Sequence, residues 1–239
     1  MRPRRPRWLP WVAALAATVL FATLGLWQLD RARQKGDWVA AIERGDRVPA
    51  VALPADPGEF GALVWQRVRA TGRLRGDRQI LLDNRIHDGR VGFDVLVPLV
   101  RGNGDVILVD RGWVPADRER GPARPIGLQR DGEVEVRGRL WRPDRGFALG
   151  PALGGDRGWP RVATRIDYEE LGAALGVPLL PAVIRADPSI DWALEPRPLR
   201  PRFGPMRHLG YAVQWFALAV TVVAVCVYFR LRGRRRQKS

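Results

Sequence analysis

The chain has 239 residues, a net charge of +15, one cysteine and two histidines. A single cysteine excludes an intrachain disulfide and a CxxC redox or zinc motif, and two histidines exclude a histidine-rich metal site built by one chain. Excess positive charge is typical of nucleic-acid-binding proteins, but here most of it lies beside two uncharged segments near the chain ends.

Ten basic residues account for most of the net charge of +15, and they flank the two uncharged segments. Basic residues beside apolar spans hold the cytoplasmic side of a membrane and meet anionic lipid. We therefore expect a lipid bilayer and no nucleic acid as partner, with both termini cytoplasmic. The ten residues are Arg2, Arg4, Arg5, Arg7, Arg230, Arg232, Arg234, Arg235, Arg236 and Lys238.

The first predicted transmembrane helix covers residues 8–28. No residue from Trp8 to Trp27 is charged, and about 20 helical residues cross a bilayer core of about 30 Å. The basic start resembles that of a signal peptide, but the apolar run is too long and lacks a small-residue cleavage site. We expect an uncleaved anchor whose helix continues out of the membrane to Ile42.

Residues 29–205 are predicted to form an extracytoplasmic, periplasmic domain rich in strands. A loop covers 46–59, and turn signals occur at 88–90 and 102–105. Asp167 with Glu170 predicts a capped helix over 167–175, as in a capping box. The predicted strands are 64–70, 79–83, 92–100, 106–109, 133–140, 161–166 and 182–185.

The second transmembrane helix is predicted over 206–230, since Leu209 to Phe229 carries no charge, and residues 231–239 form a basic cytoplasmic tail. The fold class is thus an α+β membrane protein, in which two transmembrane helices flank an extracytoplasmic antiparallel β-barrel or sandwich with short helices. The high arginine and alanine content suggests a bacterial source, so we expect the chain in a bacterial inner membrane.

Nothing in the outer domain indicates an enzyme. It has Ser189 but no histidine except His87, so a nucleophile–base pair is missing. His87 follows a strand within a hairpin connection and is predicted to be a solvated turn residue. Asp83, Asp94 and Asp110 precede or end strands and are predicted to be turn or salt-bridge residues.

His208 lies at the mouth of the second span. Two interpretations stay open: an interfacial residue hydrogen-bonded to lipid or backbone, and an axial ligand of haem iron. On a helix, His208, Tyr211 and Trp215 stand at i, i+3 and i+7 and share a face. The two aromatic rings could flank a porphyrin, although aromatic belts at membrane interfaces are expected in any case.

The first span ends on the same outer side where the second begins. If the spans pair, Trp27 and Gln28 meet His208 and Tyr211 at one depth. Arginines just beyond that depth could pair with the propionates of a haem, or serve as ordinary interfacial anchors. They are Arg31, Arg33 and Arg207.

Four motifs in order resemble the surfeit locus protein 1 family, the membrane-bound assembly factors of cytochrome c oxidase. The first span ends LGLWQLDR at 24–31, similar to the family's LGxWQLxR. LDNR at 82–85 precedes Gly89, Gly92 and Pro98, and VDRGWVP at 109–115 is close to VNRGWVP. HLGYAVQWF at 208–216 is similar to HLxYAxQWF. Asp110 replaces the usual asparagine, and Gln34 stands where a tryptophan often follows the first motif.

The resemblance implies a role in making the haem-containing oxidase subunit, without catalysis. Bacterial relatives are thought to bind haem a and help place it, with the histidine that matches His208 as ligand. The implied cofactor is transiently bound haem a, and the implied partners are the oxidase subunit and haem a synthase. The Arg111-Gly112-Trp113 stretch has two open interpretations: a surface feature near a membrane or partner, and a buried tryptophan with an arginine ion pair.

Two other functions compete with haem delivery. A haem-independent scaffold would stabilise an oxidase assembly intermediate without pigment. An anchored periplasmic enzyme is disfavoured, because the nucleophile–base pair is missing. A pigment in the purified protein separates haem delivery from both.

Overall fold

The structure is a computed structural model that describes residues 8–117, 126–143, 150–155, 158–197 and 204–236. It divides into two compact units: a helical unit formed by residues 1–40 and 200–239, and a barrel unit formed by residues 41–199.

Two long helices dominate the helical unit: α1 (Leu9–Arg47) and α4 (Pro205–Arg236). Both are long and apolar enough to cross a membrane, as predicted for 8–28 and 206–230. The helix of the first span continues to Arg47, past the predicted end at Ile42. After Pro10 in the first turn of α1, the chain has no proline before Pro49. Pro205 begins α4, at a position where a missing backbone N–H costs little.

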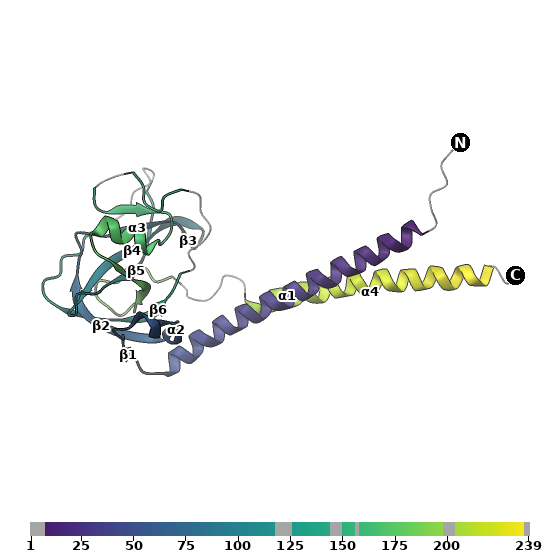
Figure 1. Ribbon diagram of the computed structural model, residues 1–239, viewed down its shortest axis with the longest axis horizontal. Helices are drawn as coiled ribbons and strands as arrows, with labels where there is room; N and C mark the ends of the chain where they lie inside the picture. Colours follow the sequence, from purple (N-terminus) through teal and green to yellow (C-terminus); the bar gives the residue numbers. More distant parts are fainter. Residues whose placement is uncertain (1–7, 118–125, 144–149, 156–157, 198–203, 237–239) are drawn as a thin grey trace. The chain divides into compact units, whose positions relative to one another are not determined.

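The two helices lie side by side and run antiparallel (Figure 1), because contacts at rising positions in α1 fall at decreasing positions in α4. The ring of Phe21 stacks on Trp215 with centroids 5.7 Å apart. Buried small residues lie along both helices, and small residues allow close backbone approach within membranes. They are Gly25, Ala32, Ala212 and Ala219.

On each helix, the residues that contact the other helix or are buried are spaced three and four positions apart. This spacing is typical of the contact seam of an antiparallel, coiled-coil-like helix pair. The seam residues are Thr18, Phe21, Gly25, Gln28 and Ala32 on α1, and His208, Ala212, Trp215, Ala219, Val223 and Cys226 on α4.

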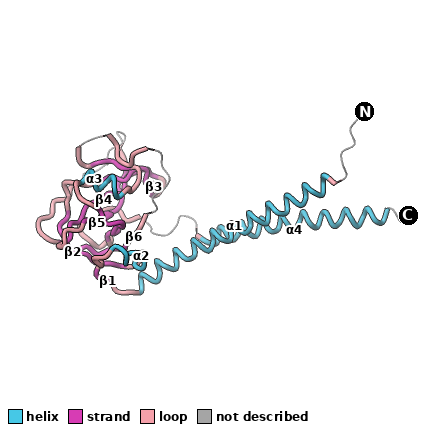
Figure 2. The backbone as a smooth tube through the Cα atoms, in the orientation of Figure 1, coloured by secondary structure: helices cyan, strands magenta, loops and turns pink. Residues whose placement is uncertain are grey.

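The barrel unit contains, among the described residues, one sheet in the order β1-β2-β6-β8-β5-β4-β3-β7 with a further β2–β4 pairing. That pairing closes β2, β6, β8, β5 and β4 into a ring. The strands of this unit are magenta in Figure 2. The strands are β1 (Val51–Ala52), β2 (Arg67–Leu74), β3 (Ile80–His87), β4 (Arg90–Arg101), β5 (Val106–Pro115), β6 (Val134–Trp141), β7 (Arg161–Ala163) and β8 (Leu179–Ala186).

Short helices η1 (Pro57–Glu59), α2 (Phe60–Leu63) and α3 (Tyr168–Leu175) complete the unit. Strand β1 and η1 lie in the stretch 46–59 that was predicted to be a loop. The barrel with short helices matches the predicted fold class, and the turns at 88–90 and 102–105 are confirmed as hairpins joining β3 to β4 and β4 to β5.

Barrel closure explains one wrong strand boundary. Strand β2 was predicted to stop at Thr71-Gly72, but it continues to Leu74 and pairs with β4. A Cβ on Gly72 would lie 2.3 Å from the carbonyl oxygen of Val100. The glycine therefore permits the close backbone approach that closes the ring, and does not end the strand.

The strand pairing is mixed. Strand β5 pairs with β8 in parallel, as β1 does with β2 and β3 with β7. Parallel neighbours need a crossover, and the chain between β5 and β8 supplies it through β6 and α3. Strands β4 and β5 are buried on both faces, so buried and exposed residues do not alternate along them. The strand predicted over 106–109 is therefore shorter than the observed β5.

Separate apolar cores occupy the two faces of the central strands. Val97, Ile107 and Ile184 belong to the cluster that also includes Phe60 and Trp192. The second cluster consists of residues whose side chains point to the other face of these strands, and it includes Leu171 of α3. Its strand residues include Leu82, Leu96, Leu108 and Val183. The central strands therefore form a rigid platform for the side chains at their ends.

Helix α3 confirms one half of the predicted capping box. The Asp167 carboxylate accepts a hydrogen bond from the Glu170 N–H at 3.2 Å. The Glu170 carboxylate, however, accepts from the N–H groups of Ala152 and Leu153 at 2.7 and 2.9 Å. The reciprocal half is therefore wrong, because Glu170 satisfies backbone donors of another loop instead of the cap.

Candidate functional site

His208 lies in the first turn of α4 and meets α1. Its Nδ1 is 2.8 Å from Oε1 of Gln28, a residue 180 positions earlier in the chain. An amide oxygen can only accept, so in this arrangement Nδ1 donates the hydrogen bond and Nε2 is the ring nitrogen left to act as a ligand. A hydrogen bond that orients the ring and selects the tautomer is typical of metal-ligating histidines.

The predicted aromatic face around His208 is divided in the structure. Trp215 joins His208 in the helix seam, because seven residues bring it back to α1, where it stacks on Phe21. Tyr211 lies beside the seam and is 42% exposed, and Trp27 is 49% exposed. Trp215 therefore holds the helix pair, while Tyr211 and Trp27 keep free ring surface near the imidazole depth.

The arginines predicted as propionate partners occupy the same end of the helical unit. The guanidinium of Arg31 lies 5.6 Å from the centroid of the Trp27 ring and donates to Oε1 of Gln34 at 3.0 Å. Gln34 in turn donates to Asp30 at 2.7 Å. Gln34, which departs from the family pattern, thus extends a polar network around Arg31. Arg33 and Arg207 are exposed.

A cavity in the helical unit lies toward the ends of α1 and α4 that are remote from His208. It measures about 260 Å³ and is lined mainly by apolar side chains. Its α1 residues begin at Trp11 and its α4 residues include Cys226, so it lies many turns from His208. The hydrogen bond between His208 and Gln28 and the apolar cavity are therefore separate features of the helix pair.

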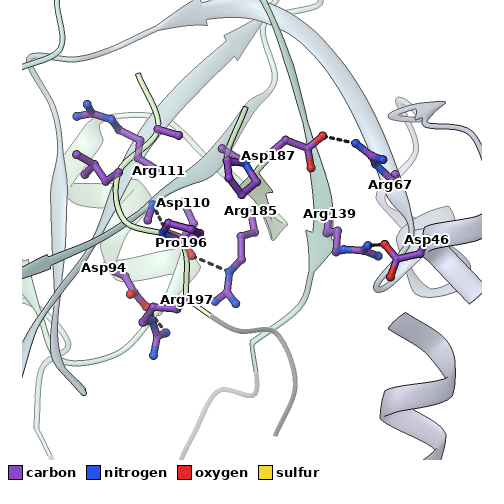
Figure 3. A pocket seen from close by; sticks show the side chains of 15 residues that line it. Asp46, Arg67, Asp94, Asp110, Arg111, Arg139, Arg185, Asp187, Pro196 and Arg197 are labelled. Carbon is purple, nitrogen blue, oxygen red and sulfur yellow. Dashed lines mark hydrogen bonds and ion pairs between the residues drawn. The ribbon is translucent and has the colours of Figure 1, made fainter. Parts of the chain in front are cut away.

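A charged pocket in the barrel unit is a site that the sequence analysis did not identify (Figure 3). It measures about 230 Å³ and is lined by acid–arginine pairs. Register places Asp110 beside Arg185, Arg185 beside Arg139, and Arg139 beside Arg67, across four adjacent strands. The pairs are Asp94–Arg197 at 2.5 Å, Asp110–Arg185 at 3.0 Å, Asp187–Arg67 at 2.6 Å, and Asp46–Arg139.

Asp94 is the deepest carboxylate of this pocket, with only 1% of the side chain exposed. Burial raises its pKa to about 6, helped by the charge of Asp110 and opposed by Arg197, Arg185 and Arg85. Burial also lowers the pKa of Arg85.

The predicted salt-bridge role of Asp94 and Asp110 is confirmed, but their predicted place at strand ends is wrong, because both lie inside strands, and their common pocket was missed. The available signal was a carboxylate within an apolar strand, as in Phe93-Asp94-Val95, since a buried charge requires partners.

The Arg111-Gly112-Trp113 stretch is buried, so the second of its two interpretations is correct in that respect. Arg111 donates to the carbonyl oxygens of Trp192 and Ile126 and to Gln79. Gly112 has φ 117°, a conformation that favours glycine. Trp113 is fully buried. This stretch therefore ties distant loops to the barrel.

The prediction that His87 is a solvated turn residue is wrong. Only 12% of its side chain is exposed, although it stands at the end of β3 beside the turn. The imidazole packs edge-on against Trp113, with ring centroids 5.3 Å apart. A buried ring from a distant strand shields it, which the local sequence could not reveal.

Comparisons with known proteins agree with the motifs. The model of the SURF1 family matches residues 15–220. A SURF1-like protein of Monosiga brevicollis is 27% identical over 239 residues, covering 94% of this chain and 88% of the relative. An uncharacterised SURF1-like protein of Mycobacterium tuberculosis is 28% identical over 246 residues, covering 98% and 89%. Surfeit locus protein 1 of Takifugu rubripes is 29% identical over 146 residues, covering 54% and 60%. The chain belongs to the SURF1 family.

Proposed function

We propose that this chain is a cytochrome c oxidase assembly factor of the bacterial inner membrane. It binds haem a at the His208 end of the α1–α4 pair and assists its insertion into the haem-containing oxidase subunit. The SURF1 family is a family of cytochrome oxidase assembly factors, which supports the general role. Haem a is the cargo in this proposal, and haem a synthase is the partner expected to supply it.

The observation that carries the proposal is the hydrogen bond between His208 and Gln28. It holds the neutral ring with Nε2 available, and neutral imidazole is a good ligand for haem iron. One imidazole held by one hydrogen bond gives a ligand that can also release the cargo. No bond of the haem is made or broken beyond ligation, so His208 provides affinity and not turnover.

Neighbouring side chains suit the rest of a haem. Tyr211 and Trp27 have exposed ring surface for contact with an apolar macrocycle. Arg31 and Arg207 are exposed cations at the same end and are proposed to pair with the propionates. Trp215 contributes indirectly, because its stacking on Phe21 keeps the two helices together.

The test is co-expression with the haem a synthesis enzymes, purification in detergent, and an absorption spectrum. We expect wild type to carry haem a and His208→Ala to lose most of it. His87→Ala is the matched control, since His87 is the other histidine of the chain and lies in the barrel unit. Equal haem in wild type and His208→Ala would overturn the ligand role.

The same preparations separate haem delivery from a haem-independent scaffold. Copurification of the oxidase subunit without pigment, together with full oxidase assembly in a strain carrying His208→Ala, would favour the scaffold. Pigment that depends on His208, together with loss of oxidase haem in that strain, would favour delivery.

A further inference from the structure

The end of the β3–β4 hairpin gathers three potential metal ligands. His87 ends β3, Arg90 begins β4, and the two residues pair in register across the turn. Asp88 and Gly89, with φ 46° and 76°, form the tight connection between them. This geometry places the side chains of His87 and Asp88 at one end of the hairpin.

Glu195 is brought to the same place by the segment that follows β8. The Trp113 N–H donates to the Glu195 carbonyl at 2.7 Å, and the Glu195 N–H donates to the Trp113 carbonyl at 3.3 Å. This bridge places Glu195 Oε1 3.2 Å from His87 Nε2. Asp88 Oδ2 lies 3.9 Å from the same nitrogen. One ligand atom from each residue lies within 4.8 Å of the others.

Trp113 orients this group. Its ring contacts the His87 ring edge-on and donates its indole N–H to the carbonyl oxygen of Arg85 at 2.8 Å. The imidazole is thereby held with Nε2 toward both carboxylates, and only 12% of it is exposed. The imidazole of His87 is therefore fixed in a position suited to bind a metal ion. The carboxylates of Asp88 and Glu195 are more exposed and can move to complete the coordination.

We propose that His87 Nε2 and the carboxylates of Asp88 and Glu195 bind one divalent transition-metal ion of the zinc class, with water completing the coordination. Zinc binds imidazole nitrogen and carboxylate oxygen at about 2.1 Å, which in a tetrahedral complex puts donors about 3.4 Å apart. The 3.2 Å between His87 and Glu195 is close to that value. An imidazole ligand disfavours calcium and magnesium, which take oxygen ligands.

Arg90 competes with the ion. Its Nη2 lies 3.6 Å from Glu195 Oε1, and its guanidinium stacks over Trp113 at 5.2 Å. Two carboxylates against one guanidinium leave a net negative group that favours a cation. Metal binding would therefore break the ion pair between Glu195 and Arg90. Removing the charge of Arg90 should increase the affinity for the metal ion. A plain salt-bridge cluster predicts no effect of Arg90 on zinc.

The test is a Zn²⁺ titration of the full chain in detergent against a chromophoric chelator, with a histidine-free tag and in a Cys226→Ser background. We expect one ion per chain. His87→Ala should weaken binding at least tenfold, and Glu195→Gln and Asp88→Asn should weaken it by smaller factors. Arg90→Gln should tighten it several-fold. His208→Ala, which removes the other histidine, should leave the zinc affinity unchanged.

Equal Zn²⁺ affinity in wild type and His87→Ala would overturn the site, as would unchanged affinity in Arg90→Gln. If His87→Ala does not fold, Glu195→Gln decides the question, because it keeps the backbone bridge to Trp113 and the side-chain shape. Unchanged affinity in a folded Glu195→Gln protein would equally overturn it. The zinc readout contains no haem, so it is independent of the proposed haem delivery.

Discussion

Gly25 of α1 lies directly against the ring of Phe216 of α4: a Cβ built on the glycine would stand 2.8 Å from the Cε1 and Cζ atoms of that ring. Such a distance leaves no room for a side chain. The two helices therefore touch at a point where one contributes only backbone, which is how small residues strengthen helix pairs in membranes. Phe216 follows the seam residue Trp215 on α4, and Gln28 lies three residues after Gly25 on α1.

We predict that Gly25→Leu separates the helix pair. The new side chain would overlap the Phe216 ring, and Phe216→Ala should relieve the overlap. The measurement is the yield of a short thiol crosslinker between cysteines at positions 28 and 208 in a Cys226→Ser background. Yield should fall in Gly25→Leu and recover in Gly25→Leu with Phe216→Ala. An unchanged yield in the single variant would show that the helices do not approach at Gly25.

Gln28 is predicted to be a positioning residue for haem. Gln28→Leu removes the acceptor that orients His208 and should weaken haem binding about 10- to 100-fold. Gln28→Glu keeps an acceptor and makes the imidazole more basic, so it should retain haem. Absorption spectra of the purified variants at matched protein concentration check this. If Gln28→Leu retains as much haem as wild type, the hydrogen bond from His208 to Gln28 does not orient the imidazole for haem binding.

We predict that the raised pKa of Asp94 makes the folded chain less stable as pH rises. Its pKa rises from 3.8 to about 6 in the folded chain, chiefly because of burial. Between these values the folded chain holds a proton that the unfolded chain has lost. Stability contributed by Asp94 is therefore present below about pH 4 and is lost as pH rises to about 6, by ~3 kcal/mol.

Asp94→Asn isolates this effect, because the other titrating groups are common to both proteins. The unfolding free energy of wild type minus that of the variant should fall between pH 4 and 6 and stay constant above about pH 7. Thermal unfolding of the full chain in detergent, followed by tryptophan fluorescence, gives the comparison. A difference that stays constant from pH 4 to 7 would contradict the raised pKa.

Glu170 is predicted to stabilise the barrel unit through another loop. Glu170→Ala leaves the N–H groups of Ala152 and Leu153 without their carboxylate acceptor, at a cost of about 2 kcal/mol. Asp167→Ala removes only the helix cap and should cost about 1 kcal/mol. Urea unfolding of the full chain measures both. A smaller loss for Glu170→Ala than for Asp167→Ala would contradict the tertiary role.

Features that depend on local pattern were predictable. The two spans follow from uncharged runs of about a bilayer's length, and the hairpins at 88–90 and 102–105 follow from turn residues between strands. The meeting of Gln28 and His208 was also predictable in outline, because two antiparallel spans of similar length bring the end of the first beside the start of the second. Its hydrogen bond, and the tautomer that it selects, were not.

Features that depend on distant residues were missed. Arg197 pairs with Asp94 across 103 positions, and the bridge between Trp113 and Glu195 joins β5 to the segment after β8. Both depend on the parallel β5–β8 pairing, which a single sequence read for short strands does not reveal. The shielding of His87 by Trp113 has the same origin.

By itself, the sequence determined that this is a membrane protein with two terminal spans, a strand-rich domain between them and a histidine at one span's edge. These properties follow from composition, charge and local periodicity, which act within a few turns of chain. The tertiary structure alone decided which nitrogen of His208 is free, which carboxylates are buried together, and which residues approach His87. Those outcomes depend on contacts between residues far apart in the chain, where packing and desolvation determine which side chains meet.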